Sequence, residues 1–229
     1  MEKGIIKSAN KLHHEKKIKK IIVISLVVIL LILLIFYLVI GIIYNRGNVS
    51  ITLEKDLYFD NGIIIYDDTE YKVYRSELLA PVPKTFDGMS YKWLPDNLGN
   101  VSLGSHNGDN YLAYTFLIEN RGDEAIDYKY SVVISDVIKD VDEAVRIRIY
   151  RGDEDYTTYA KLSATGVAEK ETVPFIDDKT INTEEVFNFS PGDINKYTIV
   201  MWVEGTDLEC TDNILGGEIK ISMNFEKLD

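Results

Sequence analysis

The chain offers few residues for acid–base or metal chemistry. Of its three histidines, His13 and His14 lie near the amino terminus and His106 lies in a stretch rich in Gly and Asn. The zinc motif HExxH and the nucleophile turn GxSxG do not occur in the sequence. Ser8 and Lys11 match SxxK, but they belong to a short lysine-rich tail that no fold could hold. The sequence therefore assigns no catalytic, cofactor-binding or metal residues by motif.

Three clusters of carboxylates could supply oxygen ligands to calcium. They are Asp67, Asp68 and Glu70; Asp153, Glu154 and Asp155; and Glu204, Asp207, Glu209 and Asp212. Calcium takes six to eight oxygens, several of them from one loop, and none of these clusters matches the EF-hand pattern DxDxDG. We expect a solvated acidic surface and no cofactor, with calcium in these acidic loops as the alternative.

Cys210 is the single cysteine, so no disulfide can form within the chain. We expect a small buried apolar side chain there, and a reactive thiol or a bridge between two chains is the alternative. A low cysteine count also suits an oxidising location outside the cell.

Two further motifs could bind partners at a surface. Arg-Gly-Asp, an integrin ligand when it lies at a loop tip, occurs at 121–123 and 151–153. Both copies end predicted strands, where Gly-Asp also makes an ordinary turn, and we expect turns. Trp93 and Trp202 could stack on sugars, although aromatic residues in strands more often belong to the core.

Charge divides the chain into distinct segments. Residues 1–20 carry seven lysines against two glutamates, or +5, and residues 21–44 carry no charge. Since the whole chain has a net charge of −12, residues 45–229 carry −17. Such an acidic body excludes nucleic acid as a partner, because phosphate binding needs a basic field.

The uncharged run IIVISLVVILLILLIFYLVIGIIY, residues 21–44, is predicted to be a transmembrane helix. At about 1.5 Å per residue it reaches about 36 Å, enough to cross a hydrocarbon core of about 30 Å. Because lysines lie before it, the positive-inside rule predicts a cytoplasmic tail at 1–20 and an extracellular domain at 45–229. We expect an uncleaved, single-pass signal anchor in the cell membrane. A cleaved secretory signal is the alternative, although the run is longer than such signals and no small-x-small site follows it.

Beyond residue 48 the hydrophobic period changes to two. Apolar residues alternate with charged ones in Val145–Ile149 and with charged or polar ones in Ile219–Phe225, and they share one face in Leu112–Ile118. This pattern predicts strands with one face on a core and the other in water. The segment Tyr197–Val203 is apolar on both faces, which predicts a central strand covered on both sides.

Turn signals place the remaining elements. Asp60-Asn61-Gly62 predicts a type I′ hairpin between strands at 57–59 and 63–65. Further strands are expected at 49–54, 71–75, 128–135, 156–161 and 184–189, with helical turns at 136–143 and 207–215. Residues 80–110, with three prolines, are expected to be loop-rich. Many short strands predict a mainly β fold: an antiparallel, jelly-roll-like β-sandwich after one transmembrane helix.

Three segments resemble the camelysin/TasA group of exported proteins from low-GC Gram-positive bacteria. They are YTIVMWVEGTDLECTDNILGGEIKISMNF at 197–225, YTFLIENRGDEAIDYKYSVVI at 114–134 and DVDEAVRIRIY at 140–150. The resemblance implies a jelly-roll-like sandwich on the cell exterior and, in some members, fibres of the biofilm matrix in which a strand of one subunit completes the sheet of the next. Camelysins have also been classed as metalloproteases.

We therefore expect a non-catalytic structural or adhesive module of the cell surface. Its partners would be the lipid bilayer and other surface or matrix proteins, bound through exposed sheet edges. One alternative is a surface metalloprotease of the camelysin kind, with a metal held by His106 and acidic residues. Another is an accessory subunit of a membrane complex, paired through the lysine-rich tail or the apolar helix.

Overall fold

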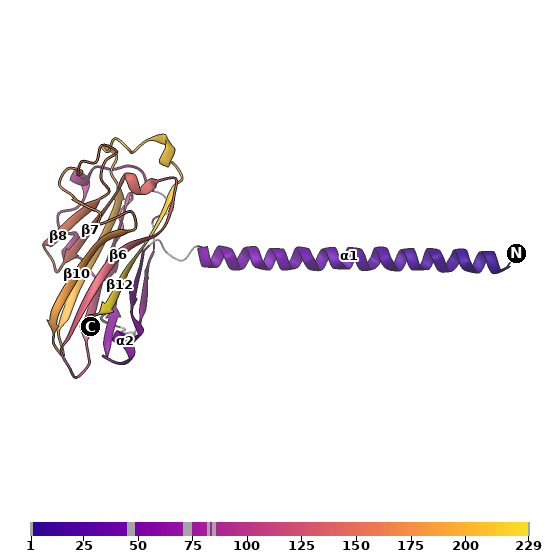
Figure 1. Ribbon diagram of the computed structural model, residues 1–229, viewed down its shortest axis with the longest axis horizontal. Helices are drawn as coiled ribbons and strands as arrows, with labels where there is room; N and C mark the ends of the chain where they lie inside the picture. Colours follow the sequence, from indigo (N-terminus) through magenta and orange to yellow (C-terminus); the bar gives the residue numbers. More distant parts are fainter. Residues whose placement is uncertain (1, 45–48, 71–74, 82, 84–85, 229) are drawn as a thin grey trace. The chain divides into compact units, whose positions relative to one another are not determined.

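The computed structural model describes residues 2–44, 49–70, 75–81, 83 and 86–228. The chain divides into two compact units, residues 1–46 and 47–229, which we call the helical unit and the β unit (Figure 1). The helical unit holds α1 (Glu2–Tyr44), a single helix that runs through both the lysine-rich tail and the uncharged segment. Within α1, Lys17–Val39 is long and apolar enough to cross a membrane, and none of it is buried in the chain. A membrane anchor and a signal sequence both meet this description.

The β unit contains two mixed sheets. Sheet A has the strand order β10-β6-β12-β1-β3. Its strands are β1 (Val49–Leu53), β3 (Glu77–Ala80), β6 (Ile126–Ile138), β10 (Thr180–Phe189) and β12 (Glu218–Lys227). All pairs in this sheet are antiparallel except β1 with β12, which is parallel.

Sheet B has the order β2-β5-β11-β7-β8-β9, and β4 also pairs with β5. Its strands are β2 (Ile63–Tyr66), β4 (Gly104–Ser105), β5 (Tyr111–Asn120), β7 (Val145–Arg151), β8 (Asp155–Ala160), β9 (Val173–Pro174) and β11 (Ile194–Val203). The pair β8 and β9 is parallel and the other pairs are antiparallel. A mainly β fold after one apolar helix is thus confirmed, and the expectation of purely antiparallel pairing is refined to mixed sheets.

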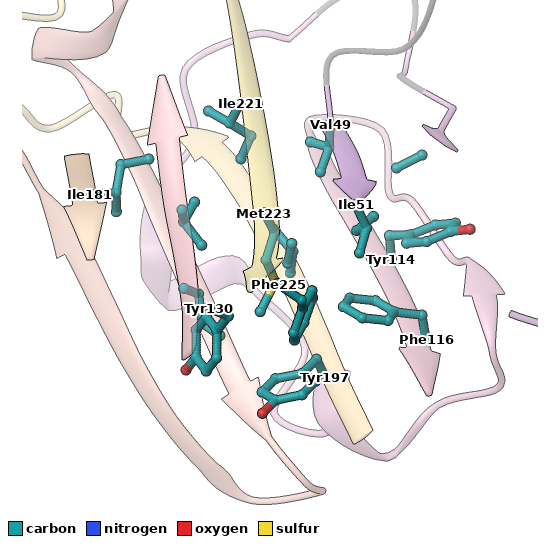
Figure 2. Packing of buried hydrophobic residues seen from close by; sticks show 14 of the residues in the cluster. Val49, Ile51, Tyr114, Phe116, Tyr130, Ile181, Tyr197, Ile221, Met223 and Phe225 are labelled. Atoms are coloured by element: carbon teal, nitrogen blue, oxygen red, sulfur yellow. The ribbon is translucent and has the colours of Figure 1, made fainter. Parts of the chain in front are cut away.

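The main core lies between the two sheets, because each strand turns every second side chain inward. Sheet A contributes residues such as Ile51, Tyr130 and Phe225, and sheet B contributes Phe116 and Tyr197 (Figure 2). The Phe225 ring meets the rings of Phe116, Tyr130 and Tyr197 at centroid distances of 6.0, 5.7 and 5.6 Å. The two sheets are therefore joined by aromatic packing as well as by aliphatic side chains.

A polar network closes the core where β10 approaches sheet B. The Glu184 carboxylate accepts hydrogen bonds from Tyr130 Oη at 2.6 Å, Arg151 Nη1 at 2.8 Å and Tyr159 Oη at 3.2 Å. Burial and the Glu184 carboxylate both raise the pKa of Tyr130, so its hydroxyl stays protonated and donates. One side chain of sheet A thereby binds two strands of sheet B.

A second apolar cluster covers the outer face of sheet B. Met89, Leu94 and Leu98 from the loop-rich segment pack on Val200 and Trp202 of β11. This segment contains two 3₁₀ turns, η1 (Tyr91–Trp93) and η2 (Leu98–Asn100). The covering segment explains why Tyr197–Trp202 is buried on both faces, as the sequence predicted for a central strand.

The hairpin predicted around Asp60-Asn61-Gly62 is wrong in its first arm. Residues Lys55–Phe59 form a one-turn helix, α2, which places Leu57 in the core and leaves Phe59 exposed. Strand β2 pairs with β5 instead, so its backbone groups find partners without a local hairpin. Gly62 keeps the positive φ, +68°, that the turn signal indicated.

Other elements shift from their predicted bounds. The helical turns expected at 136–143 and 207–215 are short 3₁₀ turns, η3 (Val141–Glu143) and η4 (Asp212–Ile214), because β6 continues to Ile138. The strand predicted at 71–75 falls mostly on residues 71–74, outside the described residues, and Arg75 forms an isolated bridge with Ile65. The strands predicted at 49–54, 128–135, 156–161 and 184–189 correspond to β1, β6, β8 and β10.

Candidate functional site

The outer face of sheet B carries charged side chains beneath a cover. On β7, Ile147 and Ile149 turn toward the main core, and Arg146 and Arg148 turn the other way. Register places Arg146 opposite Trp202 of β11 and places Arg148 opposite Thr158 of β8. The prediction that this face of β7 lies in water is wrong for Arg146, which is 4% exposed.

Arg146 is the centre of a compact charge cluster. Its Nη2 donates to Asp207 Oδ2 and lies 3.2 Å from Glu169 Oε2. The carboxylates of Glu169, Asp207 and Glu209 offer oxygens that all lie within 4.8 Å of one another. We call Arg146 with these three acidic residues the Arg146 cluster. The guanidinium supplies a positive charge that a buried carboxylate such as Asp207 requires.

The Arg146 cluster contains three carboxyls and one guanidinium, and the pKa values of all three carboxyls are shifted. Burial raises the pKa of Asp207, and the neighbouring Glu209 raises it further by hydrogen bonding. The same hydrogen bond lowers the pKa of Glu209. Burial also raises the pKa of Glu169, and the charge on Asp207 adds to that rise. A proton is thus held more tightly in the cluster than on isolated carboxyls.

Glu204 is a second buried carboxylate, 4% exposed, on the same face. It accepts hydrogen bonds from Trp202 Nε1 at 3.0 Å, the Tyr91 backbone N–H at 2.9 Å and Thr206 Oγ1 at 2.6 Å. Since Tyr91 belongs to the covering segment and Trp202 to β11, Glu204 ties the cover to the sheet. We infer a structural role for this residue.

A pocket of about 290 Å³ opens beside the Arg146 cluster. Arg148, Tyr156 and Trp202 line it from the sheet, Tyr91 lines it from the covering segment, and Lys170 lines it from the connection between β8 and β9. The Arg148 guanidinium lies 4.3 Å from the Tyr156 ring centroid and 5.4 Å from the Trp202 ring. We call this cavity the Arg148 pocket. It combines cationic, aromatic and acidic groups in one concave site.

The predicted calcium residues are only partly brought together. Asp207 and Glu209 meet, but Glu204 binds Trp202 and Thr206 instead. In the other clusters, Asp67 accepts from Tyr114 Oη at 2.5 Å, Asp153 pairs with Lys196 at 2.6 Å, and Asp155 pairs with Arg151 at 3.0 Å. Most of these carboxylates thus have protein partners.

His106 and Cys210 show no activated chemistry. His106 Nδ1 lies 3.2 Å from the Gly104 carbonyl oxygen, and burial lowers the pKa of the imidazole. In the described part of the chain, the side chains that lie close enough together to hold one cation are Glu169, Asp207 and Glu209, and His106 is not one of them. Cys210 is a half-buried free thiol. Burial and the charges of Asp207 and Glu204 raise its pKa, which disfavours the nucleophilic thiolate.

The first Arg-Gly-Asp copy lies in the connection from β5 of sheet B to β6 of sheet A, and the second lies in the turn between the paired strands β7 and β8. In the first, Gly122 packs so closely on the Asn61 carbonyl that a Cβ would lie 2.1 Å from its oxygen. In the second, Arg151 and Asp153 make the ion pairs described above, and Gly152 has a φ of +81°. These contacts support the turn interpretation. Of the tryptophans, Trp93 is 72% exposed and Trp202 is 1% exposed, so they do not form one platform.

Sequence reasoning missed Arg148, Glu169 and Tyr91. Glu169 lies 38 positions before Asp207 in a segment without regular alternation, and nothing local predicts that it folds back onto β7. The available signal was Arg146 and Arg148 themselves, because two arginines alternating with isoleucine on a central strand need acceptors or stacking partners.

The fold defines a class of protein, a two-sheet β unit joined to a helix long and apolar enough to span a membrane. No protein-family model matches this chain, and no curated protein matches it. The function has to be inferred from the residues themselves.

Proposed function

We propose that this chain is a single-pass membrane protein and that its β unit is a non-catalytic structural or adhesive module on the outside of the cell. The observation that carries the proposal is the helix α1. Its segment Lys17–Val39 exposes apolar side chains on all sides, with none of the segment buried in the chain. Such a surface is stable in hydrocarbon, where a helix also satisfies its own backbone hydrogen bonds.

The lysines supply the orientation. Seven of them precede the uncharged run, while Arg46 and Lys55 are the nearest basic residues after it. Positive charge flanking a span is retained in the cytoplasm. We therefore propose that the tail at 1–20 lies inside the cell and that the acidic β unit lies outside. An uncleaved anchor follows from the length of the run and the missing cleavage pattern.

Contact with partners is proposed to use a sheet edge. Strand β10 is ten residues long and ends sheet A, so one side of it lies beyond the ladder with β6. The terminal strand β9 of sheet B has only two residues, one of them Pro174, which protects that edge. Phe187 on β10 is 64% exposed and adds apolar area to the open edge. These features support strand addition to β10 by a surface or matrix protein.

From the resemblance to the camelysin/TasA group, we also propose a role in the biofilm matrix. The supporting feature is the two-sheet β unit, which is the architecture that the resemblance implies. The protein proposed here differs from a fibre subunit, because its amino-terminal segment stays in the membrane.

The experiment is cysteine labelling on intact cells. In a Cys210→Ser background, Leu208→Cys reports on the β unit, because Leu208 is 91% exposed, and Ser8→Cys reports on the tail. A membrane-impermeant maleimide should label position 208 on intact cells and position 8 only after permeabilisation. Labelling of position 8 on intact cells, or protection of position 208, would reject the proposed topology.

The edge contact has its own test. A photo-crosslinking residue at Glu185, which is exposed on β10, should give crosslinked species on cells. The matched position is Lys220, on the central strand β12 of the same sheet. Equal crosslinking from both positions would show that β10 is not the contact edge.

A further inference from the structure

The three arginines of β7 differ in their acidic partners. Arg146 pairs with Asp207 and Glu169, and Arg151 pairs with Asp155 and Glu184. Arg148, between them, is within ion-pair distance of no carboxylate in the described part of the chain. A half-buried guanidinium without an anion is unusual, since burying a charge costs free energy unless it is paired.

Arg148 is nevertheless held in a defined position. Its Nε donates to Thr158 Oγ1 at 2.9 Å, and its Nη1 lies 3.5 Å from Tyr150 Oη. The Tyr156 ring lies against the guanidinium at 4.3 Å. These contacts use two of the five N–H donors of an arginine. The remaining donors belong to a side chain whose orientation is already fixed, so an acceptor would bind without ordering it first.

The rest of the Arg148 pocket restricts what that acceptor can be. Four carboxylates line the pocket against three cationic side chains. They are Glu169, Glu171, Glu204 and Asp207. This surplus of negative charge disfavours a dianion such as phosphate. A ligand with one negative charge, placed on Arg148, is repelled less than a dianion, and hydroxyl donors on the same ligand suit the carboxylates, which accept hydrogen bonds from hydroxyls.

Size and wall chemistry agree with a sugar acid. The volume of about 290 Å³ lies just below the range of about 300–1,000 Å³ for ligand pockets. A pocket of this volume suits a single monosaccharide residue. Tyr91 and the exposed part of Tyr156 provide aromatic surface for the apolar face of a pyranose ring.

We propose that the Arg148 pocket binds a uronic acid residue of an acidic polysaccharide, with the sugar carboxylate on the Arg148 guanidinium. This ligand class deepens the proposed adhesive function, on which its biological meaning rests. The binding itself needs only the folded β unit. Failed binding and failed membrane topology are therefore separate results.

The test measures the binding of D-glucuronate to the full chain purified in detergent. Ligand-detected NMR and calorimetry are the two measurements. D-glucose is the matched neutral probe, and inorganic phosphate and an N-acetylated dipeptide with a free carboxylate are the competing anions. We expect glucuronate to bind about 10- to 100-fold more tightly than glucose, because a charge-assisted hydrogen bond is lost with glucose. Phosphate and the dipeptide should bind weakly.

Variants locate the binding. Arg148→Met keeps an apolar stem against Tyr156 and should weaken glucuronate binding about 10- to 100-fold while leaving glucose binding unchanged. Arg148→Lys should recover only part of the affinity, because an ammonium cannot stack and fork as a guanidinium does. Lys129→Met on β6 of sheet A is the matched control and should bind as the unaltered chain. An unchanged circular dichroism spectrum confirms that each variant is folded.

Three results would overturn the proposal. They are equal affinity for glucuronate and glucose, undiminished glucuronate binding by folded Arg148→Met, and binding of the dipeptide as tight as that of glucuronate. The last result would make the occupant a peptide carboxyl terminus.

Discussion

The helical unit and the β unit use the same apolar residue types in opposite ways. Leu30 in α1 is 64% exposed and Phe36 is 63% exposed, whereas Ile147 and Phe116 in the β unit are fully buried. Strands of the β unit pair in two sheets that cover each other, so apolar side chains find partners within the chain. In the segment Lys17–Val39 of α1, by contrast, no residue is buried. Hydrophobic residues thus stabilise the β unit by folding, and in our proposal those of the helix stabilise it by entry into lipid.

The sharpest way to break this contrast is to place charge in the helix. The run at 21–44 contains 20 Leu, Ile, Val and Phe residues, worth about 6–12 kcal/mol for insertion at about 0.3–0.6 each. Aspartate at Leu26, Leu30, Leu34 and Leu38 costs about 2.5–3.5 kcal/mol apiece near the centre, which cancels that gain. We expect the protein to leave the membrane fraction on ultracentrifugation. Four Leu→Ala substitutions at these positions are the control, and continued membrane residence of the aspartate variant would contradict the anchor.

A core substitution should have the reverse effect. Phe225→Ala removes a fully buried ring that contacts four other aromatic rings. We expect a loss of about 3–5 kcal/mol in the free energy of unfolding, with membrane association unchanged. Both tryptophans lie in the β unit, so tryptophan fluorescence in urea and detergent reports its unfolding alone.

The fluorescence assay depends on Trp93 and Trp202, so the control has to remove a different exposed aromatic residue. We use Phe59→Ala as this surface control. Phe59 is 73% exposed, and its removal should change the unfolding free energy by less than about 1 kcal/mol. A loss as large as that of Phe225→Ala would show that the assigned core is wrong.

The Arg146 cluster sharpens the contrast, because here the β unit buries charge as well as apolar area. Arg146→Ala leaves the Asp207 side chain, which is fully buried, without its cation. We expect a loss of about 3 kcal/mol in the same urea titration. Adding Asp207→Leu should restore much of the stability, since it removes the unpaired charge. A double variant less stable than Arg146→Ala would argue against a buried ion pair.

The smallest expected effect is a pH dependence within the β unit. The pKa of Asp207 is raised in the fold by burial and by Glu209, so the folded state binds its proton more tightly than the unfolded state does. The stabilisation from this proton is complete below the ordinary carboxyl pKa of about 3.9 and is lost as pH rises through the raised value. The stability of the unaltered chain relative to Asp207→Asn should therefore fall as pH rises above about 4.

Asp177 provides the opposite control. Backbone N–H groups of Lys179 and Thr180 lower its pKa, so its stabilisation is present above the ordinary pKa and is lost as pH falls through the lowered value. The stability of the unaltered chain relative to Asp177→Asn should fall on acidification. The same pH trend for both variants would contradict these assignments.

The strands were predictable where alternation or double-sided hydrophobicity was strong. Val145–Ile149 and Ile219–Phe225 lie in β7 and β12, and the doubly apolar Tyr197–Val203 lies in β11 at the centre of sheet B. Local patterns work there because a strand in a two-sheet core must present every second side chain to that core.

The candidate site was not predictable in the same way. The alternation of Ile and Arg indicates that the strand has two different faces, but it does not indicate which residues pack on each face. The partners of Arg146 are Glu169 and Asp207, which lie in loops distant in sequence. The turn signal at Asp60-Asn61-Gly62 marked a real positive φ at Gly62 but not the partner of β2. Tertiary contacts decide both outcomes.

The membrane anchor is tested most directly by the intact mass of the protein extracted from cell membranes. An uncleaved anchor predicts a membrane-bound chain close to the full 26.1 kDa, whose amino-terminal peptide includes the lysine-rich tail. A soluble exported species that begins after residue 44 would contradict the anchor and would make the helix a cleaved signal.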